Sequence, residues 1–126
     1  MNTEMENKEL TPRELGEIIV KTLDAKKAKD IKLLRIDDKT VLADYFVICG
    51  GNSNTQIRAL AGEVEEKLKE IGIEPHHIEG YNEASWTVLD YSSVIVHIFS
   101  REAREFYKLE KLWSDGEDID ISGLLV

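Results

Sequence analysis

The glycine-rich stretch Gly50-Gly51-Asn52-Ser53 is the first place in the chain where residue types and spacing could do chemistry. It joins an apolar segment to a segment with helical periodicity, so its backbone N–H groups and the positive end of the helix could bind a phosphate. The same residues also suit a tight turn between a strand and a helix, and no lysine follows as in a P-loop. The pattern favours the structural turn and leaves phosphate binding open.

Metal-ligating and nucleophilic side chains are few and scattered along the chain. His76 and His77 are adjacent, so in a strand they would point to opposite faces and could not bind the same metal ion. A structural zinc site needs four ligands, and three widely spaced histidines with one cysteine do not provide them. Cys49 lies in the apolar run YFVIC without a basic neighbour that would activate a thiol. The sequence therefore predicts no metal site and a buried, unreactive cysteine.

Residues 86–99 contain two strand-like segments that meet at the serine pair 92–93. A two-residue loop there would place Trp86 opposite Phe99 in an antiparallel pair. Because side chains alternate between the two faces of a strand, one face is nearly all apolar and should lie on the core. That face carries Thr87, Leu89, Tyr91, Val94, Val96 and Ile98. The opposite face carries Trp86, Val88, Asp90, Ile95, His97 and Phe99.

The second of these faces mixes two aromatic rings with a carboxylate and an imidazole, which is more typical of a recognition surface than of a core layer. Two alternatives remain. A helix could cover the face, so that Trp86 and Phe99 belong to the core and His97 is a buried imidazole. A bulge at the loop, which has no glycine, would instead exchange the two faces. We predict that the face contacts a protein partner through Trp86, Val88, Asp90, His97 and Phe99.

Three helices are marked by capping residues at their starts. The sequence TPRE at 11–14 is a capping box with proline at the first helical position, and it predicts a helix over 12–28. The sequence SNTQ at 53–56 is a second capping box, and Gly72 marks the end of that helix. Ser100 can cap a last helix, which is charged and carries aromatic residues.

Strands are predicted at 30–36, 41–49 and 76–80, in addition to the hairpin at 86–99, because apolar and β-branched runs are bounded there by turn residues. The order of elements is therefore α-β-β-α-β-β-β-α. Hairpins force antiparallel pairs, whereas the long helix between the second and third strands permits a parallel crossover. We predict an α/β (α+β) fold with a mixed five-stranded sheet and helices packed on it.

A chain of 126 residues buries roughly two-thirds of its unfolded surface, which is enough for one domain. We predict that this single domain spans residues 10–114 and is preceded by a flexible tail at 1–9. Residues 115–126 form an acidic and then apolar C-terminal tail. This tail docks either on the body or on a neighbouring chain, and the sequence does not decide between them.

The net charge of −9, from 25 acidic and 16 basic residues, argues against direct nucleic-acid binding, because phosphate-binding proteins cluster lysine and arginine. A basic protein is the partner that this charge favours. The longest apolar run is about six residues, far below the ~20 needed to cross a bilayer, and the start of the chain is acidic where a signal peptide would be basic. We predict a cytoplasmic protein without a membrane partner.

Several segments resemble the ribosomal silencing factor family, also called Iojap-like proteins. They are DYFVICGGNSNTQIRALAGEVEEKL, EGYNEASWTVLDY, VIVHIF and FYKLEKLW, and the resemblance spans about residues 10–114. It implies a protein that binds the large ribosomal subunit through ribosomal protein L-fourteen, blocks association of the small and large subunits and represses translation during starvation or in stationary phase. It also implies a homodimer and a nucleotidyltransferase-like fold. We predict no cofactor.

This fold relationship supplies the alternative hypothesis of a nucleotidyltransferase-like, nucleotide-binding enzyme. Such an enzyme holds two metal ions on two acids that lie one residue apart in the strand after its glycine-containing loop. Here that strand offers His77 and Glu79, and Asp90 is more distant, so the acidic set is incomplete. We therefore predict no catalytic residue and no enzymatic activity. A dimeric scaffold without a ribosomal role is a third hypothesis, which only the resemblance disfavours.

Overall fold

A single mixed sheet organises the computed structural model, which describes residues 10–112 and 116–126. The strands are β1 (Lys29–Arg35), β2 (Tyr45–Gly51), β3 (His77–Glu79), β4 (Trp86–Asp90), β5 (Val94–Ser100) and β6 (Glu117–Asp118). Their order across the sheet is β3-β4-β5-β2-β1-β6, with β2 and β5 parallel and each other neighbouring pair antiparallel. The predicted mixed sheet is confirmed, but it has six strands and not five.

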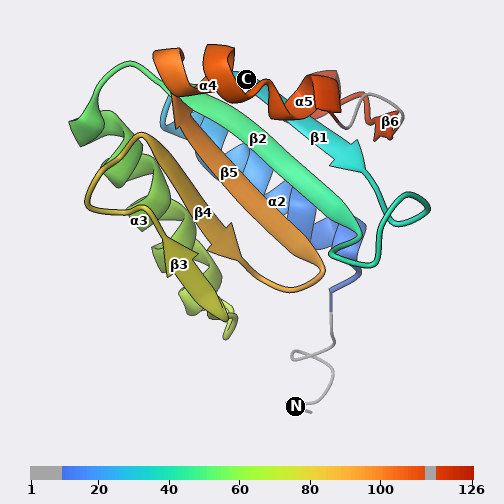
Figure 1. Cartoon of the computed structure of the whole chain (residues 1–126). Coiled ribbons are helices and arrows are strands. Elements are labelled where there is room, and N and C mark those ends of the chain that lie inside the picture. The colour runs from blue at the N-terminus through green and yellow to red at the C-terminus, as the bar shows by residue number, and fades with distance from the viewer. Residues whose placement is uncertain (1–9, 113–115) are drawn as a thin grey trace.

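Helices cover both faces of this sheet (Figure 1). They are α2 (Pro12–Ala25), α3 (Asn54–Glu70), α4 (Arg101–Tyr107) and α5 (Leu109–Leu112), with a 3-10 helix η1 (Ser122–Leu124) near the C-terminus. The predicted order of elements is confirmed as far as α4. The last predicted helix is interrupted, because Lys108 adopts a left-handed conformation with φ +50° between α4 and α5. In the part of the chain that the structure describes, none of the helices could span a membrane, since each is too short or too polar.

Two cores form on opposite faces because side chains alternate along the buried strand β2. Val47 and Cys49 belong to the main core, which α2 and α3 cover with residues such as Ile19 and Leu60. Phe46 and Ile48 of the same strand join a second core, which the α4–α5 region covers. The second core contains Leu34, Ile36, Ala43, Phe46, Ile48, Phe99, Ala103 and Leu109.

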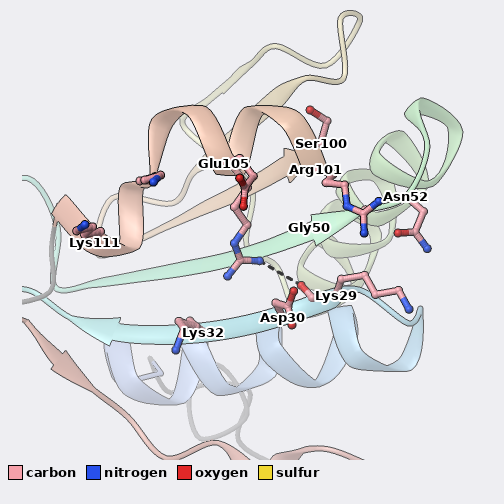
Figure 2. A pocket seen from close by; sticks show the side chains of 12 residues that line it. Lys29, Asp30, Lys32, Gly50, Asn52, Ser100, Arg101, Glu105 and Lys111 are labelled. Atoms are coloured by element: carbon pink, nitrogen blue, oxygen red, sulfur yellow. Dashed lines mark hydrogen bonds between the residues drawn. The ribbon is translucent and has the colours of Figure 1, made fainter.

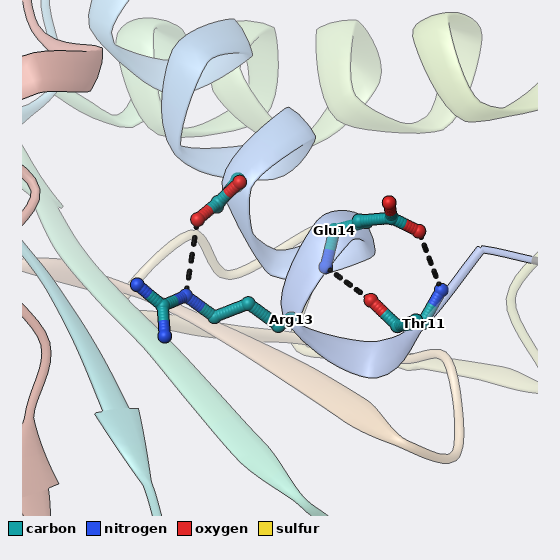
Figure 3. A network of polar contacts seen from close by, with 4 residues as sticks. Thr11, Arg13 and Glu14 are labelled. Carbon is teal, nitrogen blue, oxygen red and sulfur yellow. Dashed lines mark hydrogen bonds and ion pairs between the residues drawn. The ribbon is translucent and has the colours of Figure 1, made fainter.

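The start of α2 is fixed by the predicted capping box (Figure 3). The backbone N–H of Glu14 donates to Thr11 Oγ1 at 3.0 Å, and the backbone N–H of Thr11 donates to Glu14 Oε1 at 2.9 Å. An ion pair between Arg13 and Glu17 adds one contact on the exposed side of the same turn. The helix ends at Ala25, three residues before the predicted end at 28, because the chain turns at Lys27 with φ +65°.

The start of α3 differs in one detail from its prediction. Ser53 Oγ accepts a hydrogen bond from the backbone N–H of Gln56 at 3.0 Å, as a capping residue should. The Gln56 side chain, however, accepts from the backbone N–H of Asn52 at 2.5 Å and not from that of Ser53. The predicted second capping box is therefore only half correct. The predicted stop is confirmed, since Gly72 follows the helix with φ +83°.

The second strand begins at Tyr45, four residues later than predicted. The preceding residues form a loop that is closed by a hydrogen bond from the backbone N–H of Ile36 to the carbonyl of Asp44. Val41 and Leu42 are exposed in this loop although they are apolar. Apolar residue type alone placed them in the strand, which is why the predicted boundary was wrong.

The C-terminal segment docks on the body of the same chain. Strand β6 pairs with β1, and Ile119 and Ile121 are buried in the main core. The backbone N–H of Val126 donates to Asp24 Oδ2 at 2.9 Å, which ties the chain end to α2. Intramolecular docking is thus the alternative that the structure favours for residues 116–126. The predicted tail at 1–9 lies outside the described residues.

Candidate protein-binding surface

The hairpin of β4 and β5 has the predicted register, with Trp86 opposite Phe99 and Asp90 opposite Ile95. Its turn contains no glycine, but Ser92 takes a left-handed conformation with φ +71°. The backbone N–H of Ser92 donates to Asp90 Oδ1 at 2.8 Å, which holds the turn in this conformation. No bulge therefore interrupts the pairing, and the two faces are the predicted ones.

The face predicted to contact a partner is partly covered by α4. Phe99 is fully buried and His97 is 7% exposed, whereas Trp86, Val88 and Asp90 are half-buried. The alternative of a covering helix is therefore correct for one end of the face, where Phe99 belongs to the second core. In this conformation His97 and Phe99 lie beneath the surface, and the β4 side chains and Ile95 are the ones on this face that a partner could touch.

Aromatic rings from the strands and from α4 stack around Trp86. The Trp86 ring lies 5.1 Å from that of Phe99 below it and 4.6 Å from that of Tyr107, measured between ring centroids. Phe106 packs edge-on against Tyr107 at 5.0 Å and is 79% exposed, and Tyr107 is 48% exposed. We call Trp86, Phe106 and Tyr107 the aromatic patch. Phe106 and Tyr107 were missed as site residues, although two adjacent aromatic residues in a charged helix are a usable signal.

His97 orients the Trp86 ring from below. Trp86 Nε1 donates a hydrogen bond to His97 Nδ1 at 3.1 Å, so this imidazole nitrogen is an acceptor. Burial lowers the pKa of His97 to about 4, which keeps the ring neutral at pH 7. Phe46 packs edge-on against the same imidazole at 4.6 Å. The indole is therefore held in one orientation by the core beneath it.

Two carboxylates, on β3 and β4, share the sheet face of Trp86. In the antiparallel pair of β3 and β4, His77 lies opposite Asp90 and Glu79 opposite Val88, so all four side chains share the face that carries Trp86. His77 Nε2 and Glu79 Oε2 are 2.7 Å apart, and both side chains are exposed. A sheet face that carries the Trp86 ring together with the carboxylates of Glu79 and Asp90 suits a basic, partly apolar protein partner.

Cys49 and the glycine-rich stretch, the other candidate groups from the sequence, have structural roles. Cys49 is buried, and burial raises the pKa of its thiol to about 12. Gly51 closes β2, where an added Cβ would lie 2.7 Å from Ile57 Cγ1, so close packing requires a glycine there. Among the described residues, no three His, Cys, Asp or Glu side chains lie together as metal ligands would.

The comparisons with known proteins agree with this architecture. The family model described as "Ribosomal silencing factor during starvation" matches residues 9–125. The chain belongs to the ribosomal silencing factor family. A "Ribosomal silencing factor RsfS" from Halalkalibacterium halodurans is 37% identical over 116 residues, which cover 92% of this chain and 99% of the relative. The resemblance predicted from the sequence is thereby confirmed.

A solved bacterial structure and a mouse protein are also similar to this chain. A crystal structure of a protein from Chromobacterium violaceum has a TM-score of 0.81 and 31% identity, covering 90% of this chain and 93% of that one. The mouse protein named "Mitochondrial assembly of ribosomal large subunit protein 1" is 31% identical over 101 residues, which cover 78% of this chain and 44% of the mouse protein. Membership makes this chain a ribosome-associated regulator of translation.

Proposed function

We propose that this protein binds the large ribosomal subunit through ribosomal protein L-fourteen, blocks association of the small and large subunits and represses translation during starvation or in stationary phase. The family match over residues 9–125 carries this proposal. The name of the mouse relative refers to the large ribosomal subunit, which supports that subunit as the partner.

The contact is proposed to be the face of Trp86, Val88 and Asp90, extended by Phe106 and Tyr107 of the aromatic patch. Trp86 is the anchor, because it is half-buried and so still accessible in part, and its ring is held in place from below. His97 and Phe99 support this anchor without touching the partner. Truncating a central interface tryptophan commonly costs ~2 kcal/mol or more of binding free energy, about thirtyfold in affinity.

Charge supports a protein contact more than an RNA contact at this face. The chain carries a net charge of −9, and Glu79 and Asp90 lie on the proposed surface. Negative charge repels the ribosomal RNA backbone and attracts a basic protein. L-fourteen is therefore proposed to provide the basic side of the contact.

The remaining parts of the proposal concern chemistry and assembly. We propose that the protein is not an enzyme, because His77 stands where a nucleotidyltransferase would need a carboxylate, next to Glu79 in the same strand. The relationship to nucleotidyltransferases is proposed for the fold alone. A cytoplasmic homodimer is proposed as the form in the cell.

Binding of purified L-fourteen to variants of this protein tests the proposed contact. Trp86→Ala and Asp90→Lys should each weaken binding by tenfold or more. Glu70→Lys makes the same charge change at an exposed position in α3 and should leave the affinity within about twofold. Equal losses for Asp90→Lys and Glu70→Lys, or full binding by Trp86→Ala, would show that another surface makes the contact.

A further inference from the structure

A basic cleft of about 760 Å³ lies at the carboxyl ends of the parallel strands in this acidic molecule (Figure 2). This volume is within the ~300–1,000 Å³ typical of small-ligand sites. Two carboxylates, Asp30 and Glu105, also line the cleft, so positive charge is in excess by four. Its six basic side chains are Lys29, Lys32, Arg101, Arg104, Lys108 and Lys111.

The cleft lies where the chain leaves two neighbouring parallel strands in opposite directions. After β2 the chain enters α3, whose Ile57 packs in the main core on one face of the sheet. After β5 it enters α4, whose Ala103 packs in the second core on the other face. Such a reversal opens a crevice at the carboxyl ends of parallel strands, and ligands of sheet proteins bind preferentially in that crevice.

The floor of the cleft includes the backbone of Gly50, which has no side chain and lies between two basic residues. A Cβ on Gly50 would lie 3.7 Å from Arg104 Nη1 and 3.9 Å from Lys29 Cβ, so glycine keeps the space between them open. Arg104 Nη1 donates to the backbone carbonyl of Lys29 at 3.4 Å, which draws the guanidinium across the cleft (Figure 2). At one end Asn52 precedes the N-terminus of α3, which adds partial positive charge.

Most of the basic side chains in the cleft are available to a ligand. Lys32 pairs with Asp118, with 3.3 Å between Nζ and Oδ2. By contrast, Lys29, Arg101, Lys108 and Lys111 form no salt bridge with any of the residues that the structure describes. Unpaired charges that converge on one cavity are expected to attract an anion.

We propose that this cleft binds a small anion with two or more phosphate groups, such as inorganic triphosphate or the polyphosphate chain of a nucleotide. Its described lining residues include no aromatic ring, so recognition depends on the phosphates and not on stacking with a base. The net charge of −9 opposes a long polyanion such as RNA, whereas a short one lies within the local field of the cleft. The proposal is independent of the contact with L-fourteen, since it uses none of those residues.

Isothermal titration of the full-length protein with inorganic triphosphate, ATP, adenosine and a short single-stranded RNA tests the proposal. Triphosphate and ATP should bind with affinities within about tenfold of each other, adenosine should not bind, and the RNA should bind more weakly than triphosphate. The exposed Lys29→Glu and Arg101→Glu, made as separate variants, should each weaken triphosphate binding by tenfold or more. Lys21→Glu, the same change on the exposed side of α2, should leave it within about twofold.

Three results would overturn the proposal. Triphosphate could fail to bind at millimolar concentration, or Lys21→Glu could weaken it as much as the cleft variants do, which would show diffuse charge attraction. Tighter binding of the RNA than of triphosphate, lost in the cleft variants, would assign the cleft to a nucleic-acid backbone instead. Circular dichroism of each variant confirms that the fold is intact, and binding to L-fourteen should be unchanged in the cleft variants.

Discussion

Trp86 and Leu89 lie on opposite faces of β4, and truncation should affect them differently. Leu89 is fully buried in the main core, so Leu89→Ala should lower the free energy of unfolding by ~2 to 5 kcal/mol. Trp86 is half-buried, packs against the second core and stacks on Phe99, so Trp86→Ala should cost less stability than Leu89→Ala. Urea unfolding of both variants measures the difference. Equal losses would place Trp86 in the core and remove it from the proposed contact.

His97 should make stability depend on pH below neutrality. Its pKa is lowered to about 4 in the folded protein, while the unfolded chain has the ordinary value of about 6.5. Above pH 6.5 both states are neutral at this residue and stability does not change. As the pH falls from 6.5 to 4, the unfolded chain takes up the proton first, so folding loses up to about 3 kcal/mol.

The variant His97→Gln isolates this contribution, because glutamine does not titrate and its side-chain oxygen can still accept from Trp86 Nε1. Urea unfolding between pH 4 and 7 should show a shallower loss of stability for the variant than for the wild type. Parallel curves for the two proteins would mean that His97 is not the group responsible.

At this scale the sequence predicted which side chains share a face but not how deeply each is buried. Alternation along β4 and β5 gave the pairing of Trp86 with Phe99 correctly. The burial of His97 and Phe99 depends on where α4 lies across the sheet, which is a tertiary arrangement. Phe106 and Tyr107 lie next to Trp86 for the same reason and so extend the proposed site.

Among the elements, the turn between β3 and β4 has the strictest requirement. Gly80 has φ +76°, and a Cβ there would lie 2.1 Å from the carbonyl oxygen of Trp86. Gly80→Ala should therefore destabilise the protein by more than 1 kcal/mol, because strain and a backbone clash coincide. It should also weaken binding to L-fourteen, since the displaced residue is Trp86.

Gly62 offers the matched control within α3, because an added Cβ would meet no atom within 4 Å. Gly62→Ala should stabilise the protein by about 0.5 to 1 kcal/mol, since alanine favours a helix interior. Thermal unfolding of both variants measures the contrast. A Gly80→Ala variant as stable as the wild type would show that the turn can relax.

Element starts were predictable where a local chemical signal exists and not elsewhere. Thr11, Ser53 and Ser100 all cap helices as predicted, because capping depends on neighbouring residues alone. Strand β6 has only two residues, both acidic and exposed, so no alternation marks it. Its position follows from Ile119 and Ile121 docking in the main core.

At the scale of the whole molecule, the net charge is negative although one cleft is lined mainly by basic residues. The net charge of −9 predicted a protein that does not bind nucleic acid directly. The fold instead gathers basic residues from β1 and α4, about 70 positions apart in the sequence, around one cleft. Composition could not predict this cleft, because it depends on the parallel pairing of β2 with β5.

Sedimentation of the protein with purified large and small ribosomal subunits tests the central claim most directly. The protein should migrate with the large subunit alone, and an excess of it should reduce the peak of joined subunits. Trp86→Ala should restore that peak, and Glu70→Lys should act like the wild type. Migration with the small subunit, or an unchanged peak of joined subunits despite saturated binding, would contradict the proposed function.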